Sequence, residues 1–184
     1  TDPLACNILA ANSLQGITAQ EGGTLICDGF TIRGHPNCTS INGLRGGYIS
    51  VKNIYFGGVA EGKCAPMGAA GGSQLDVIGK VTLIGAGFLA VFSAIEASRI
   101  VLAPQNEICF GNAMDFGFMF NMMNASTWTQ GSPPNFTGAI AGSTGQKFNN
   151  YYNAFIGFDH NLIPGSAGSQ DYQGALPVTT SQIY

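Results

Sequence analysis

Carboxylates are the side chains in this sequence whose type and spacing best suit a chemical reaction. Enzymes that hydrolyse polysaccharides use two carboxyl groups, one as acid and one as base or nucleophile, and lyases use a base with a positive group or a metal. Asp76 and Glu96 are the candidate catalytic pair, because each lies on the outward phase of an expected strand. Whether they meet depends on strand register. Asp28 precedes Gly29, where a carboxylate most simply stabilises a turn.

Trp128 is the single tryptophan, and its neighbours in the sequence are Asn, Ser, Thr and Gln. An indole ring exposed in polar surroundings can stack on a sugar, so Trp128 is a candidate glycan-binding residue. The alternative is that Trp128 seals the junction between two modules. The sequence leaves both interpretations open.

Metal and cofactor chemistry are not indicated. The five cysteines are odd in number and none has Cys-x-x-Cys spacing, while His35 and His160 lie far apart. A zinc site needs clustered ligands, so we expect no metal and no cofactor. Cys27 and Cys109 lie in apolar runs and are expected to be buried thiols. No Ser-His-Asp grouping or phosphate-binding loop is present.

Composition favours a β-rich fold. Charged residues make up 9% of the 184 residues and glycine contributes 27, against about 25% charged residues in an average domain. So few charges suggest that part of the surface is covered in an oligomer or a larger particle. The seven basic residues do not cluster, so we expect no nucleic-acid partner. The longest apolar run, 85–95, is too short to span a bilayer. The chain begins without Met or a signal peptide, which we interpret as a processed product or a fragment.

A repeat occupies the first two thirds of the chain. Its units share an apolar pair after a small or polar corner, and the last interval between pairs is shorter than the two before it. The pairs are Phe30/Ile32, Ile54/Phe56, Val81/Leu83 and Ile100/Leu102, with corners at Asp28-Gly29, Lys52-Asn53, Gly79-Lys80 and Ala97-Ser98.

A period near 24 is typical of one coil of a parallel β-solenoid. We therefore predict an all-β fold, a parallel β-helix (β-solenoid) of about four coils over residues 1–112, with residues 57–73 as a loop. The alternative is a β-sandwich with evenly spaced strands.

A different pattern begins after the repeat, and residues 113–135 are expected to form an aromatic strand and a Pro-rich connection. Phe116, Phe118, Phe120 and Met122 alternate along one strand face, and the opposite face is not strongly polar. A strand that is apolar on both faces is either central or pressed against another chain. We therefore predict that these four side chains form a trimer interface.

The C-terminal part carries a family resemblance. Its turn-rich units are Phe136-Thr-Gly138, Gly145-Gln-Lys-Phe148, Phe158-Asp-His-Asn161 and Ile163-Pro-Gly165, followed by Tyr172. Together they resemble the terminal segment of tailed-phage or prophage tail fibres and tailspikes. The sequence departs from that pattern by lacking a Gly-Gly pair before the final Tyr, and by continuing to Tyr184.

The resemblance implies a homotrimer of right-handed β-helices, with residues 136–184 as a C-terminal β cap that holds the subunits together. It also implies a virion tail component, made in the bacterial cytoplasm, that binds a host surface polysaccharide. Two alternatives stay open: a polysaccharide-degrading β-helix enzyme, either glycosidase or lyase, and a secreted β-solenoid adhesin. No enzyme signature is present, so binding without catalysis is the expectation for this chain.

Overall fold

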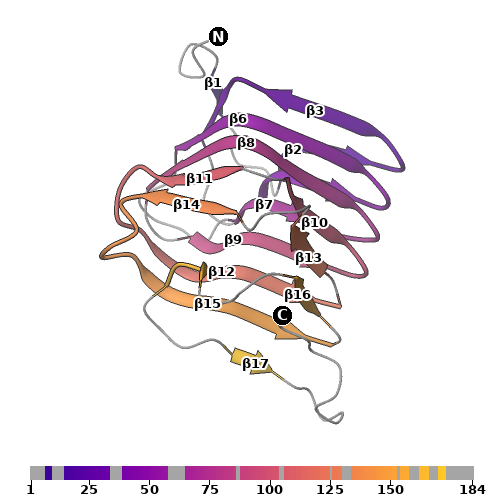
Figure 1. The fold of residues 1–184 in the computed structure, drawn as a ribbon. Coiled ribbons are helices and arrows are strands. Elements are labelled where there is room, and N and C mark those ends of the chain that lie inside the picture. The colour runs from indigo at the N-terminus through magenta and orange to yellow at the C-terminus, as the bar shows by residue number, and fades with distance from the viewer. Residues whose placement is uncertain are drawn as a thin grey trace.

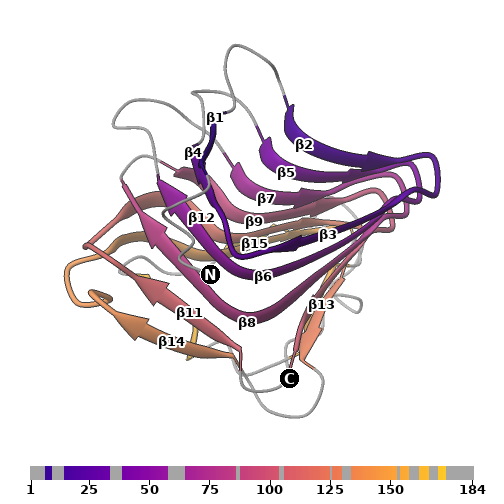
Figure 2. The ribbon, with the colours of Figure 1, turned by 90° about the horizontal axis from the view of Figure 1, so that it is seen from above.

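The computed structural model is an all-β solenoid in which strands of successive coils pair in parallel (Figure 1). It describes residues 7–9, 15–33, 39–57, 65–85, 88–103, 106–124, 126–129, 134–152, 154–157, 162–165 and 170–172. Within these residues the strands form two sheets, and the chain passes from one sheet to the other in each coil (Figure 2). The prediction of an all-β solenoid is therefore confirmed.

The larger sheet has ten strands, and every pairing recorded within it is parallel. Its members are β1 (Asn7–Leu9), β3 (Thr24–Asp28), β4 (Thr31–Arg33), β6 (Tyr48–Gly57), β8 (Gln74–Ile84), β10 (Arg99–Leu102), β11 (Glu107–Phe110), β13 (Ser126–Thr129), β14 (Asn135–Gly138) and β16 (Phe155–Gly157). The long strands β6 and β8 run through a bend, whereas each neighbouring coil divides into two short strands at that place (Figure 2).

The second sheet has seven strands in the order β17-β15-β12-β9-β7-β5-β2. These are β2 (Gln15–Gln20), β5 (Thr39–Leu44), β7 (Ala65–Ala69), β9 (Phe88–Ile95), β12 (Asp115–Met123), β15 (Thr144–Tyr151) and β17 (Gln170–Tyr172). Strand β7 lies inside the segment 57–73 that was expected to be a loop, so that prediction is wrong for residues 65–69. Its sequence, Ala-Pro-Met-Gly-Ala, has no β-branched residue that would have marked a strand.

Apolar side chains in register make the core. Ile49, Leu75 and Ile100 are aligned on neighbouring strands of the ten-stranded sheet, and all three are fully buried. In the seven-stranded sheet Phe92 and Phe120 are aligned, and their rings stack with centroids 5.0 Å apart. Because the same position is apolar in successive coils, the coils bury one continuous hydrophobic column between the two sheets.

A turn of constant geometry leads from the seven-stranded sheet to the ten-stranded sheet, and we call it the left-handed corner. It contains Glu21, Arg45, Gly71, Glu96 and Asn124, one in each successive coil, with φ between 46° and 64°. Such a φ is unfavourable for residues other than glycine. Backbone hydrogen bonds between corners offset this cost: the amide of Gly72 donates to the carbonyl of Glu96 (2.9 Å), and that of Ala97 to the carbonyl of Asn124 (2.6 Å).

The register corrects the fourth repeat unit. Val81 and Leu83 pair with Ile108 and Phe110, not with Ile100 and Leu102. Ile100 and Leu102 pair instead with Leu75 and Val77, earlier in the coil. Ala97-Ser98 accordingly belongs to the left-handed corner. With the correct partner the third interval, from Val81 to Ile108, equals the second, from Ile54 to Val81.

The sheets cross both expected domain boundaries. Strand β12 pairs with β9, and β14 pairs with β11, so residues after 112 and after 135 continue the same two sheets. Strand β17 extends the seven-stranded sheet further along the chain. The part of 136–184 that the structure describes therefore stacks on the earlier coils; the remainder of the expected cap lies outside the described residues.

The aromatic strand is placed differently from its predicted role. Phe116, Phe120 and Met122 are buried in the hydrophobic core of the single chain, with at most 3% of their surface exposed, and Phe118 is half-buried. Phe116, Phe120 and Met122 are covered by the chain's own neighbouring coils, so these three do not form a surface for a trimer, whereas the predicted role of Phe118 stays a prediction. A strand that is apolar on both faces can be either central or in contact with another chain, and here it is central.

Candidate functional site

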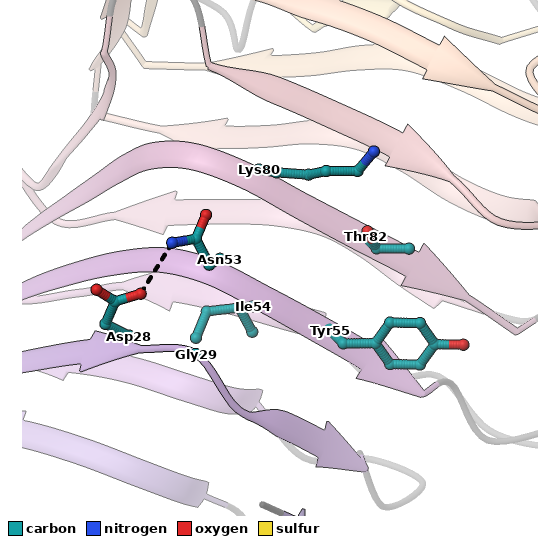
Figure 3. A pocket seen from close by; sticks show the side chains of 7 residues that line it. All are labelled: Asp28, Gly29, Asn53, Ile54, Tyr55, Lys80 and Thr82. Carbon is teal, nitrogen blue, oxygen red and sulfur yellow. Dashed lines mark hydrogen bonds between the residues drawn. The ribbon is translucent and has the colours of Figure 1, made fainter. Parts of the chain in front are cut away.

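The candidate site is a groove on the ten-stranded sheet, at the bend of strands β6 and β8. It has a volume of about 570 Å³. Figure 3 shows side chains from three successive coils along it. It is lined by Asp28, Gly29, Asn53, Ile54, Tyr55, Lys80 and Thr82. We call it the bend groove.

Local backbone conformation creates the bend. Asn53 and Gly79 have φ of 52° and 69°, and Gly29 has 74°. Between Lys52 and Ile54 the register shifts by one residue against β8, which is the signature of a β-bulge. A bulge turns the strand and re-aims the side chains on either side of it. Asn tolerates this conformation better than most residues, and its amide is used here: Nδ2 of Asn53 donates to Oδ1 of Asp28 at 3.0 Å.

Charged groups of the groove are paired between coils. Nζ of Lys52 lies 4.0 Å from Oδ2 of Asp28, and Nζ of Lys80 lies 3.1 Å from Oε1 of Glu107. Thr137 donates its hydroxyl to the same Glu107 oxygen at 2.6 Å. The hydrogen bond from Thr137, and then that from Lys80, hold the pKa of Glu107 below its ordinary value. The bond to Glu107 raises the pKa of Lys80.

Beyond the bend, one outward position carries Tyr55, Thr82, Cys109 and Thr137 in register on β6, β8, β11 and β14. All four side chains are half-buried. A phenol ring, two threonine hydroxyl groups and the Cys109 thiol between them, spaced by about 4.8 Å from strand to strand, offer hydrogen bonds and one aromatic face to a polymer lying across the coils.

Asp76 lies on the same sheet face, before the bend. Its carboxylate accepts hydrogen bonds from the hydroxyl of Tyr48 (2.8 Å) and from Nε2 of Gln74 (2.6 Å), and Arg99 donates to Gln74. Partial burial and then the bond to Asp76 raise the pKa of Tyr48. The carboxylate is thus fixed by two donors and has further lone pairs for a ligand.

Trp128 falls in the same column as Asp76. Val101 pairs with Asp76 on one side and with Trp128 on the other, so the two candidates stand two coils apart at one register position. The placement of the indole ring lies outside what the structure describes. The register therefore brings together on one sheet position two residues that the sequence had indicated separately.

Glu96 does not join Asp76. It occupies the left-handed corner, exposed, at the end of β9, where its amide donates to the carbonyl of Met123. Asp76 faces Val101 on the next coil instead. Asp28 in the bend groove and Glu107 beside it are three strand spacings apart, about 14 Å. Glycosidase carboxylates lie about 5–9.5 Å apart, so Asp28 and Glu107 are not spaced as such a pair.

Most of the bend groove was not predicted from the sequence, although a signal was present. The groove residues Tyr55 and Thr82 are the middle residues of the apolar pairs Ile54/Phe56 and Val81/Leu83. The residue between two inward side chains of a strand points outward. Reading those middle residues across the repeat would have located the outward column.

Cys27 is buried as expected, whereas Cys109 is half-exposed on the groove face. Among the described residues, no three His, Cys, Asp or Glu side chains gather as metal ligands do. The described part of the chain also contains no helix of the length and apolarity needed to cross a membrane. No family model, curated protein or solved structure matches this chain.

Proposed function

We propose that the chain binds a host cell-surface glycan through the bend groove. The observation that carries the proposal is the outward column of Tyr55 and Thr82 beside the amide of Asn53 and the carboxylate of Asp28. Sugars are bound by planar polar side chains and by aromatic faces. Here both kinds of group stand on paired strands, so their positions are set by the sheet and little order must be gained on binding.

The protein class that best accommodates such a surface is the distal part of a tailed-phage tail fibre or tailspike. Supporting this proposal are the β-solenoid itself and the turn pattern from Phe136 to Tyr172. In this proposal the coils form a right-handed β-helix, the residues after 136 also cap it, and the protein is part of the virion tail, made in the bacterial cytoplasm.

The proposal includes a homotrimer. It rests on the family resemblance and on the low share of charged residues, 9%, since a surface with few charges favours association. The trimer contact would use outer surfaces of the coils, because Phe116, Phe120 and Met122 are enclosed in each chain. Analytical ultracentrifugation tests this point, and a monomer that persists at micromolar concentration would refute it.

Glycan binding is tested by titrating the purified chain with a panel of bacterial surface polysaccharides. Replacement of Tyr55 by Ala removes the aromatic face of the groove, which is worth about 0.5–1.5 kcal/mol. Binding is therefore expected to weaken by about two- to tenfold. Tyr152→Ala is the matched control, because Tyr152 is 57% exposed and directly follows β15 of the other sheet, away from the groove.

The expected result is that Tyr55→Ala weakens binding and Tyr152→Ala does not, with both variants as folded as the parent chain by circular dichroism. If the parent and Tyr55→Ala chains bound the same polysaccharide with equal affinity, the binding site would not be the bend groove. If the parent chain bound no polysaccharide of the panel, the proposed function would be rejected.

A further inference from the structure

We infer that the bend groove selects an uncharged, hydroxyl-rich stretch of glycan and discriminates against acidic polysaccharides. The inference rests on the proposed binding function and adds the chemical class of the ligand. It follows from how the charges of the groove are arranged, which the binding proposal does not use.

Each lysine beside the groove is matched by a carboxylate of the neighbouring coil. Lys52 lies beside Asp28, and Lys80 beside Glu107. The two positive and two negative groups cancel, so the groove offers no net attraction to a polyanion. Recognition of carboxylate, sulfate or phosphate groups normally uses a surplus of Arg or Lys.

Lys80 and Glu107, the ion pair beside the outward column, are also held by hydrogen bonds. Lys80 and Thr137 both donate to the same oxygen of Glu107. An acidic sugar approaching Lys80 would bring its own charge close to the carboxylate of Glu107, which would repel it at short range. A neutral sugar meets no such repulsion, since it needs only hydroxyl, amide and carboxylate partners such as Thr82, Asn53 and Asp28.

The carboxylates themselves suit a neutral ligand. A carboxylate is the strongest acceptor for sugar hydroxyl groups, and the Asp28 side chain is about half-exposed. Facing an acidic polymer, the same carboxylate would add repulsion. The alternation of acid and base along the coils thus favours hydroxyl donors and penalises like charge.

The experiment compares two neutral polymers, dextran and mannan, with two anionic polymers, hyaluronan and polysialic acid, together with neutral and acidic bacterial polysaccharides. Binding to the full chain is measured at 20 mM and 150 mM salt. The expected result is that the tightest ligands are neutral and that their affinity changes less than about twofold between the two salt concentrations, because few ions are released.

A charge variant gives the sharper test. Glu107→Gln leaves Lys80 without its carboxylate partner. At 20 mM salt, hyaluronan is therefore expected to bind this variant about five times more tightly, or better, than it binds the parent chain. This gain should largely disappear at 150 mM salt because exposed charges are screened. Asp115→Asn is the matched control: it makes the same change in net charge at an exposed residue of β12, on the other sheet, and should give no gain.

Anionic polymers binding more tightly than neutral ones to the parent chain would overturn the inference while leaving glycan binding in place. An equal gain for Glu107→Gln and Asp115→Asn would also overturn it, because net charge alone would then explain the effect. If the parent chain bound none of the polymers, the proposed function would fail and the inference with it. The outcomes therefore separate the two claims.

Discussion

The two sheets of the solenoid differ in how their residues are buried: strands of the seven-stranded sheet contribute mainly to stability, whereas the ten-stranded sheet presents polar side chains on its outer face. In the seven-stranded sheet, all five residues of β7 are buried, and so are the four central residues of β5. In the ten-stranded sheet, β8 alternates buried and partly exposed residues, and its outer face carries the ion pairs and the bend groove. Strands that are buried on both faces, such as β5 and β7, hold the coils together, whereas strands with one open face can change their outer side chains at little cost to the fold.

This comparison predicts a large loss of stability at a buried position of the seven-stranded sheet and almost none on the outer face of the ten-stranded sheet. Phe120→Ala should lower the free energy of unfolding by about 3–5 kcal/mol, because Phe120 is fully buried and stacks on Phe92. Ile26→Ala on the outer face of the ten-stranded sheet is the control, since Ile26 is 73% exposed and should change stability by less than about 0.5 kcal/mol. Urea denaturation of both variants measures the difference. Similar losses would mean that the outer face of the ten-stranded sheet tolerates change no better than the core does.

A second prediction compares two glycines that both have positive φ. Gly145 lies in β15 of the seven-stranded sheet, where an added Cβ would overlap with the carbonyl oxygen of Phe116. Gly145→Ala should therefore cost about 1–3 kcal/mol through overpacking, in addition to backbone strain. Gly22 lies at the left-handed corner with no atom within 4 Å of such a Cβ, so Gly22→Ala should cost only about 1–2 kcal/mol of strain. Thermal unfolding of the two variants measures the difference, and Gly145→Ala should have the lower Tm.

A third prediction concerns acid stability on the open face. Because the pKa of Glu107 is lowered in the folded chain, its stabilising effect is present above the ordinary pKa and is lost as the pH falls through the lowered pKa. Thr137→Val removes the strongest of its hydrogen bonds, so the pKa of Glu107 should rise toward 4.5, its ordinary value. NMR titration of Glu107 measures the change. Thr82→Val, in the same column, should leave that pKa where it is. The effect on stability should be small, because the Glu107 side chain keeps 32% of its surface exposed and its ion pair is screened by solvent.

The smallest expected effect separates the two described cysteines. Burial raises the pKa of Cys27 to about 11, so its thiol should resist alkylation in the folded chain at pH 8. Cys109 is half-exposed and should react first. Peptide mapping after brief treatment with iodoacetamide distinguishes the two. If Cys27 and Cys109 were labelled equally fast, the core around Cys27 would be as accessible to iodoacetamide as the outer face.

The same Cys27 shift has a consequence at alkaline pH. Since the folded chain holds this proton more tightly than the unfolded chain, the stability linked to Cys27 is complete below pH 9.0, its ordinary pKa, and is lost as the pH rises through about 11. Cys27→Ala should remove this part of the pH dependence.

The repeat detected in the sequence belongs to the bend, and its first three units were placed correctly because alternating apolar pairs report which residues face inward. The fourth was misplaced because Ile100/Leu102 has the same alternation as Ile108/Phe110. Alternation identifies a strand without identifying its partner. The interval from Val81 to Ile100 is shorter than the two intervals before it, which indicated that Ile100 was not the partner of Val81.

A second repeat, at the left-handed corners, was not detected in the sequence. Each left-handed corner is marked by a polar residue or glycine followed by two small residues: Glu21-Gly-Gly, Arg45-Gly-Gly, Gly71-Gly-Ser, Glu96-Ala-Ser and Asn124-Ala-Ser. A search for apolar pairs passes over this signal, because the constraint acts on the backbone. The bend groove was missed for a related reason, since hydrogen bonds such as Asn53 to Asp28 depend on lateral register, which a single sequence does not determine.

The nearly constant register has a consequence for how this chain folds. Thr24 pairs with Tyr48, Tyr48 with Gln74, Gln74 with Arg99 and Arg99 with Ser126, so each pairing closes a loop that is one coil long. Loops of similar length cost similar closure entropy, and each coil touches only its neighbours. Folding should therefore start at any well-packed pair of coils and spread along the axis like a zipper.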